Sequence, residues 1–101
     1  MPIVDCHVHQ TGPASAREVV KALDRNGVDR MLVMSPQERT SLRRTREKVG
    51  LTRRLFAAAP ERISGLAWIE PTLRGAADLA AEALDAGFAG IKIIPDHWYA
   101  H

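Results

Sequence analysis

The sequence predicts an α/β domain built from parallel βα repeats. Short apolar runs typical of strands alternate with segments of helical periodicity, and short joints rich in glycine and proline connect them. The strand-like runs are apolar at successive positions, as parallel strands covered on both faces require. Residues 22–28 and 83–88 both close a helix just before an apolar strand, which indicates a faint internal repeat. We therefore expect right-handed crossovers and a parallel sheet.

The first strand is expected at residues 3–9, Ile-Val-Asp-Cys-His-Val-His. Strand side chains alternate between faces, so Asp5, His7 and His9 are expected on one face. Two imidazoles two residues apart, with a carboxylate deeper in the strand, can converge on one divalent metal. A strand whose histidines only face solvent is the alternative. Cys6 falls on the opposite face and is interpreted as a small buried hydrophobe.

A first helix is expected at about residues 15–26 and a second strand at residues 29–35. Ser15 is the predicted N-cap, and Glu18 has the spacing that completes a capping box. An Asn-Gly pair supplies the left-handed stop. The strand that follows is apolar on both faces and ends at a proline.

Residues 37–59 are expected to form a loop and a long helix, in which Leu42, Val49 and Phe56 recur at intervals of seven. Basic side chains concentrate in residues 39–54, where seven arginines and lysines face one glutamate. We interpret this cluster as a solvated helix face, with an anion or carboxylate clamp as the alternative.

The third strand is expected at residues 63–69 and the fourth at residues 90–94. Between them a helix is predicted to begin with Thr72 as its cap and to end at Gly87. Four strands and three helices account for the whole chain.

Candidate functional residues lie at or near the carboxyl ends of these strands, where parallel sheets bind ligands. They are His9, Glu70, Asp96 and His97. Glu70, His97 and Trp98 are interpreted as substrate-binding residues, with the Trp98 ring as a flat apolar wall. A frayed terminus is the alternative for His97 and Trp98.

Lys92 interrupts the otherwise apolar fourth strand, and a buried ammonium must be paired or neutralised. We expect Lys92 to pair with an interior carboxylate such as Asp5 or Glu70, or to reach solvent. Lys92 and Asp5 are also the candidate catalytic residues. For Lys92 the catalytic alternatives are binding of a substrate carboxylate and Schiff-base formation, as in aldolase-type enzymes.

Composition narrows the class of protein. The chain has 101 residues, of which 46% are hydrophobic and 26% charged, which suits one folded domain over residues 1–101. Its net charge of +2 is too small to indicate nucleic acid or a membrane as partner. A single cysteine excludes an internal disulfide. No apolar run approaches the roughly 18–20 residues of a membrane span, so a cytoplasmic location is expected.

Three stretches carry a resemblance to a known family. Residues 4–9 resemble the first barrel strand of the metal-dependent amidohydrolase superfamily. Residues 60–71 and 87–95 resemble its amidohydrolase-related branch, which includes aminocarboxymuconate-semialdehyde decarboxylase-like enzymes and hydrolases of lactones. The resemblance covers nearly the whole chain. It implies about the first half of a TIM-type (β/α)8 barrel, because a closed barrel takes about 250 residues.

The resemblance also implies a chemistry. It places a divalent metal on His7 and His9, with further ligands on later strands. Zinc is the first choice, with manganese, iron and nickel as alternatives. The implied reaction is hydrolysis of an amide, ester or lactone bond, or a non-oxidative decarboxylation, on a small carboxylate or cyclic substrate. Some amidohydrolases also carboxylate a strand-four lysine, a position comparable to Lys92.

An open parallel sheet leaves an unpaired edge that invites association. A truncated barrel is the favoured interpretation. A half-barrel that pairs with another chain, for instance as a homo-oligomer, and a small flavodoxin-like sheet are the alternatives. The second functional hypothesis is a catalytically silent half-barrel that acts through self-association.

Overall fold

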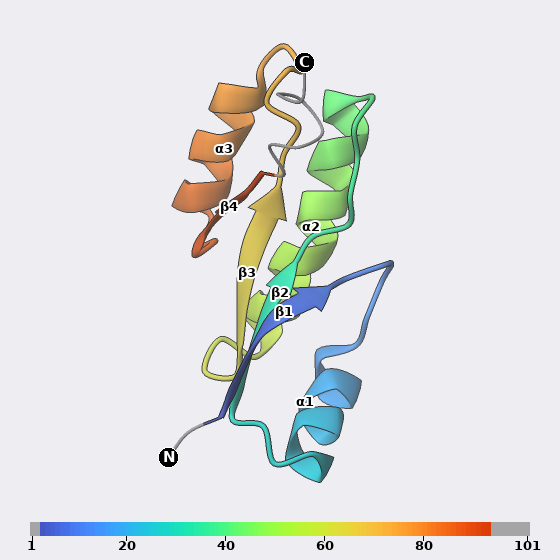
Figure 1. Ribbon diagram of the computed structural model, residues 1–101, viewed down its shortest axis with the longest axis vertical. Helices are drawn as coiled ribbons and strands as arrows, with labels where there is room; N and C mark the ends of the chain where they lie inside the picture. Colours follow the sequence, from blue (N-terminus) through green and yellow to red (C-terminus); the bar gives the residue numbers. More distant parts are fainter. Residues whose placement is uncertain (1–2, 94–101) are drawn as a thin grey trace.

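The computed structural model describes residues 3–93, without the side chains of Cys6 and His7. Strands and helices alternate along the chain as predicted (Figure 1). The elements are β1 (Val4–His9), α1 (Ala16–Arg25), β2 (Arg30–Met34), α2 (Leu42–Ala58), β3 (Ile63–Trp68), α3 (Ala76–Asp85) and β4 (Gly90–Lys92). In the described part of the chain, no helix is both long enough and apolar enough to cross a membrane.

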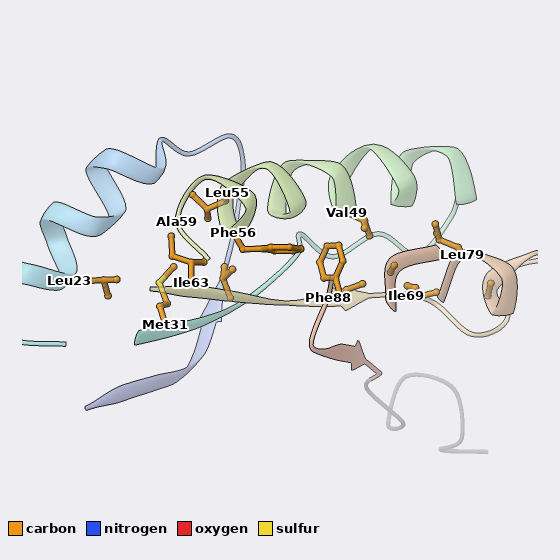
Figure 2. Packing of buried hydrophobic residues seen from close by; sticks show 14 residues of the cluster. Leu23, Met31, Val49, Leu55, Phe56, Ala59, Ile63, Ile69, Leu79 and Phe88 are labelled. Carbon is orange, nitrogen blue, oxygen red and sulfur yellow. The ribbon is translucent and has the colours of Figure 1, made fainter. Parts of the chain in front are cut away.

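The four strands form one parallel sheet in the order β1-β2-β3-β4. The helices lie together on one face of that sheet (Figure 2). A flavodoxin-like sheet reverses its strand order and carries helices on both faces. The flavodoxin-like alternative is therefore wrong, and the described residues have the layout of a stretch of barrel wall.

The hydrophobic core lies between the helices and the sheet (Figure 2). Strand residues that face the helices are almost completely buried, for instance Val33, Ile63 and Ala67 at 1%, 1% and 0% exposed. Helix α2 contributes Phe56, whose ring meets that of Phe88 edge to face, with centroids 4.9 Å apart and planes at 85°. Most hydrophobic stabilisation of the described fold comes from this one layer.

The ends of α1 are those predicted from local signals. The Ser15 side chain accepts a hydrogen bond from the Glu18 backbone N–H at 3.4 Å. At the other end Asn26 is the C-cap and Gly27 follows with φ of 66°. A left-handed residue in that place satisfies the last carbonyls, and glycine adopts it without steric cost.

The start of α3 differs from the prediction that Thr72 caps this helix. Thr72 does not cap the helix, because its hydroxyl donates to Oε1 of Glu70 at 2.6 Å. The N-cap is Gly75, with φ of 86° and no side-chain cap. Strand β4 was predicted to reach residue 94. β4 is shorter than that, because it ends at Lys92 and residue 93 is no longer in the strand; residue 94 lies outside the described residues.

Strand β1 contains an irregularity that the sequence did not reveal. Asp5 pairs with Met31 but Val8 pairs with Val33, so β1 carries one extra residue between the two pairs. Met31 and Val33 both belong to the helix-facing core. Because paired residues share a face, Asp5 lies on the helix-facing side.

His9 lies on the other face of the sheet. It pairs with Met34. Met34 directly follows Val33, which faces the helices, so the Met34 side chain points to the opposite face. Met34 is buried but does not belong to the cluster of buried residues beneath the helices. The expectation that Asp5 and His9 share a face is therefore wrong, because an extra residue reverses the alternation of a strand.

Candidate active site

The carboxyl ends of the four strands meet at one edge of the sheet and carry three of the predicted site residues. His9 is the last residue of β1, and Lys92 is the last of β4. Glu70 stands two residues beyond the end of β3. Lys92 pairs in register with Trp68 at the end of β3. The parallel order therefore brings His9, Glu70 and Lys92 to the edge where such sheets bind ligands.

The other predicted site residues are only partly placed. Asp5 is exposed, lies in the amino-terminal half of β1 and faces the helix side. The side chain of His7 is not described, although its backbone belongs to β1. Asp96, His97 and Trp98 lie outside the described residues. Their predicted roles stay predictions.

The donor chemistry of β1 fits part of a metal site. Imidazole nitrogens suit zinc and related divalent metals, and His9 reaches the exposed end of its strand. Within residues 3–93, however, no group of three or more histidine, cysteine, aspartate or glutamate side chains is placed to hold a metal ion. His7 and His9 are therefore candidates for two ligands of a larger set.

A cavity opens beside His9. Its volume is about 400 Å³, and it is lined by His9, Gln10, Thr11, Pro36, Gln37, Lys48 and Leu51. These residues come from the end of β1 and the residues after it, from the loop after β2 and from the middle of α2. The cavity therefore joins the candidate metal ligand to the basic side of α2 at the carboxyl edge of the sheet.

Gln10 is a site residue that the sequence reasoning missed. It is 7% exposed, and its amide Oε1 accepts a hydrogen bond from the Thr52 hydroxyl at 2.6 Å. Its Nε2 donates to the Gly12 carbonyl at 2.7 Å. The available signal was a polar residue with two donors and an acceptor directly after the apolar strand, next to His9.

The basic cluster is a solvated helix face for the most part, as predicted. Arg43, Arg44, Arg53 and Arg54 are exposed. Arg46 pairs with Glu82 of α3 at 3.0 Å, and both side chains are more than half exposed. Such exposed pairs contribute roughly 0–1 kcal/mol.

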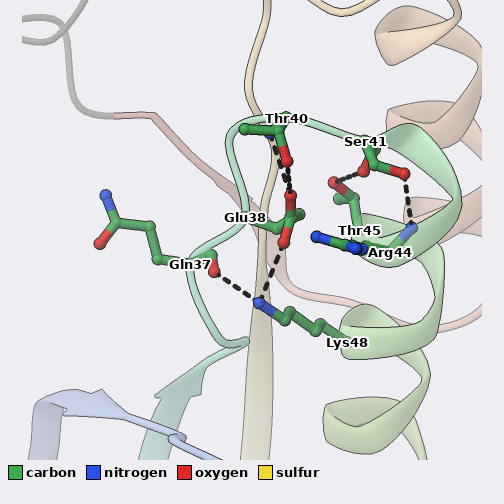
Figure 3. Close-up of polar contacts among 7 residues, drawn as sticks. All are labelled: Gln37, Glu38, Thr40, Ser41, Arg44, Thr45 and Lys48. Atoms are coloured by element: carbon green, nitrogen blue, oxygen red, sulfur yellow. Dashed lines mark hydrogen bonds and ion pairs between the residues drawn. The ribbon is translucent and has the colours of Figure 1, made fainter.

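Lys48 is the member of the cluster that turns toward the loop after β2 (Figure 3). Its ammonium donates to the Gln37 carbonyl at 3.0 Å and to Oε1 of Glu38 at 3.1 Å. Glu38 is 8% exposed, and its Oε2 accepts from the hydroxyl and the backbone N–H of Thr40 at 2.7 and 3.0 Å. The carboxylate therefore orders the loop that forms one wall of the cavity.

These contacts shift the acidity of Glu38. The hydroxyl of Thr40 and then its N–H, together with Lys48, lower the pKa of the carboxyl from 4.5 to about 2, against the opposing effect of burial. Each of these bonds stabilises the charged carboxylate, which explains why the pKa of Glu38 is lowered.

We expect Glu38→Gln to lower the free energy of unfolding by about 1–2 kcal/mol at pH 7, because a charge-assisted bond set is lost. A carboxyl whose pKa is lower in the folded state than in the unfolded chain stabilises the folded state at pH values above the unfolded pKa. This stabilisation disappears as the pH falls through the folded pKa. Wild type and variant should therefore converge between pH 4.5 and about 2. Urea unfolding at several pH values measures this, with exposed Glu61→Gln as control. A difference that stays constant with pH would contradict it.

Glu70 is the most deeply buried acid at the carboxyl edge, with 2% exposure. Its Oε1 accepts the Thr72 hydroxyl, whereas its Oε2 has no hydrogen-bond partner among the described residues. A buried carboxylate oxygen without a partner is costly. Glu70 therefore has the capacity to accept one further hydrogen bond or a cationic group at this edge.

Lys92 is half-buried beside Trp68, and no ion pair joins it to Glu70 within residues 3–93. Asp5, the other predicted partner, lies on the opposite edge strand of the sheet. The predicted pairing with Glu70 is therefore wrong for the described residues. The predicted alternative, an ammonium that reaches solvent, agrees with its partial exposure.

Comparison with known proteins agrees with this geometry. A probable 2-pyrone-4,6-dicarboxylic acid hydrolase from Acinetobacter baumannii, with citric acid bound, matches with a TM-score of 0.62 at 15% identity, over 92% of this chain and 38% of that chain. A 4-oxalomesaconate hydratase from Rhodopseudomonas palustris matches with a TM-score of 0.69 at 18% identity, over 96% and 44%. No family model and no curated protein matches the sequence.

Both solved structures are TIM-barrel proteins of the amidohydrolase superfamily. The chain spans less than half the length of either one. Its fold is therefore that of part of a TIM-type barrel, which confirms the fold class that the sequence predicted.

Proposed function

We propose that residues 1–101 are part of a single amidohydrolase-type barrel domain, and that this domain belongs to a metal-dependent hydrolase or decarboxylase. The observation that carries the proposal is His9 at the carboxyl end of β1, in a sequentially ordered parallel sheet with its helices on one face. The catalytic edge of such barrels is the carboxyl edge. The names of the two solved neighbours, a hydrolase and a hydratase, support chemistry that involves water.

In this proposal His7 and His9 hold a divalent metal, zinc by preference, together with ligands from outside residues 1–101. The metal would supply a bound water of lowered pKa and polarise a carbonyl. Lys92, half-exposed at the end of β4, attracts a substrate carboxylate. Glu70 accepts a hydrogen bond from the substrate through its second oxygen. The reaction is cleavage of an amide, ester or lactone bond, or loss of carbon dioxide from a carboxylate.

The test is metal binding by the chain itself. Metal-free protein titrated with Zn²⁺ in a calorimeter should bind one equivalent, more weakly than a complete site would, because His7 and His9 supply only two of its ligands. We expect His7→Ala and His9→Ala each to weaken binding by about 100-fold, because each removes a direct metal ligand. His101→Ala is the matched control and should bind like wild type, and circular dichroism checks that each variant is folded. Equal binding by all four proteins would overturn the proposal.

A second candidate function is self-association without catalysis. Both edges of the sheet carry exposed apolar side chains, with Ile3 and Val4 at 56% and 48% on the β1 side and Ile93 at 40% beyond β4. Beside β4 lies an apolar groove of about 200 Å³, lined by Ile69, Pro71, Ala76, Ala77, Ala80, Ile91 and Ile93. An unpaired parallel edge is a template for another strand.

The occupant in this second candidate is another copy of the chain, whose β1 edge would continue the sheet at β4. Two four-stranded halves together supply the eight strands of a barrel. Light scattering on the protein used for the zinc titration separates the two candidates. A dimer that binds no zinc favours self-association, and a protein that binds zinc through His7 and His9 favours the enzyme.

A further inference from the structure

We propose that Gln10 and Thr52 are positioning residues, which hold the end of β1 so that His9 is presented for metal binding. The inference rests on the proposed function and adds to it a pair of residues outside the predicted site. Thr52 lies 42 positions from Gln10 in sequence and belongs to α2. The pair is thus a tertiary contact between the strand that carries His9 and the helix that covers the sheet.

The contact is buried and short. Thr52 is 0% exposed and Gln10 is 7% exposed. The Thr52 hydroxyl donates to Gln10 Oε1 at 2.6 Å, and Gln10 Nε2 donates to the Gly12 carbonyl at 2.7 Å. A buried amide without partners would be costly, so each bond restricts the conformations open to this segment. Together the two bonds orient the amide and fasten the loop that follows β1.

The backbone of Gln10 transmits this restraint to His9. The Gln10 N–H belongs to the peptide unit that follows the His9 Cα, and it donates to the Met34 carbonyl at 2.9 Å. His9 itself is paired in register with Met34. The peptide on the carboxyl side of His9 is thereby fixed to β2, and the Gln10 side chain is fixed to α2. Metal ligands commonly depend on such supporting contacts for their orientation.

The irregularity of β1 explains why the end of this strand depends on such a restraint. The extra residue between Asp5 and Val8 interrupts the regular pairing with β2 immediately before the histidine end of the strand. Such irregularities re-aim the side chains near them. Pairing resumes at Val8 and His9, and the contacts of Gln10 follow directly, so they fix the point at which the strand leaves the sheet.

Thr45 offers a matched control on the same helix. It is also 0% exposed, and its hydroxyl donates to the Ser41 carbonyl at 2.8 Å, within the first turn of α2 (Figure 3). Replacing either threonine by valine removes the hydroxyl and keeps the shape of the side chain, at a buried position of α2. The two substitutions differ in that Thr52 contacts the end of β1, whereas the Thr45 bond stays inside the helix.

The experiment compares Thr52→Val, Thr52→Ser and Thr45→Val. We expect Thr52→Val to weaken Zn²⁺ affinity by about 10-fold, because supporting contacts of metal ligands have effects of that size. Thr52→Ser keeps the hydroxyl and should bind within about 3-fold of wild type, and Thr45→Val should bind like wild type. In metal-free protein, the amide of Gln10 should exchange its hydrogen faster in Thr52→Val than in the other two variants.

The outcomes distinguish this inference from the function on which it rests. If wild type binds zinc through His7 and His9 and Thr52→Val binds equally well, the inference fails and the proposed function stands. It also fails if Thr45→Val and Thr52→Val weaken binding equally, since that indicates a general loss of helix stability. If wild type binds no zinc, both fail, whatever the amide exchange shows.

Discussion

Phe56→Ala is expected to lower the free energy of unfolding by about 3–5 kcal/mol, the largest stability effect of any substitution considered for this chain. Phe56 is 8% exposed near the end of α2 and joins that helix to β3 and to Phe88. Its removal leaves a cavity in the layer on which the sheet and the helices depend (Figure 2). A domain is stable by only about 5–15 kcal/mol, so the variant should lose a large part of its stability.

Urea unfolding followed by circular dichroism measures the effect. Phe56→Leu keeps most of the apolar volume and should cost less than about 1.5 kcal/mol. A double-mutant cycle with Phe88→Leu isolates the edge-to-face contact, for which we expect a coupling of about 0.5–1.5 kcal/mol. A cost for Phe56→Ala no greater than that for Phe56→Leu would contradict the assignment of Phe56 to the centre of the core.

Gly65→Ala is the second large prediction, with an expected loss of about 1–3 kcal/mol. A Cβ at this position of β3 would stand 2.8 Å from Cδ2 of Phe56 and 3.0 Å from Cγ2 of Thr52. The strand therefore approaches α2 so closely that only a hydrogen fits. Because Thr52 is one of the two side chains displaced, we also expect Gly65→Ala to speed amide exchange at Gln10.

Gly50→Ala is the matched control, on the helix that Gly65 faces. A Cβ at Gly50 would meet only Nη1 of Arg54, at 3.6 Å, which is an ordinary contact. Gly50 lies in the interior of α2, where alanine is favoured over glycine by about 0.5–1 kcal/mol. Urea unfolding should therefore show Gly50→Ala stabilised and Gly65→Ala destabilised. Shifts of the same sign would contradict the close approach of β3 and α2.

Several features of the fold could be predicted because their causes are local. Apolar runs and helical spacing identify every strand and helix in order. Ser15 and Gly27 mark the ends of α1 because a cap bond and a left-handed residue depend on a few neighbouring residues. The prediction that Thr72 caps α3 was wrong, because the Thr72 hydroxyl donates to the buried Glu70 carboxylate instead.

The candidate site was predictable only in part. His9, Glu70 and Lys92 reach the expected edge because parallel strands bring their carboxyl ends together. The face of Asp5 was predicted wrongly, because one extra residue in β1 reverses the alternation on which the prediction depended. That extra residue is defined by the pairing with β2, and no pattern within β1 shows it.

The sequence by itself determined the order of the strands and helices and the histidine-bearing strand with which the chain begins. Periodicity, caps and turn residues act over a few positions, so they can be recognised without the fold. The tertiary structure alone decided that the helices cover one face of the sheet, that β1 is irregular, and that Thr52 holds Gln10 beside His9. The irregularity of β1 and the Thr52–Gln10 bond depend on contacts between residues 25–42 positions apart, whose geometry exists only after the sheet has formed.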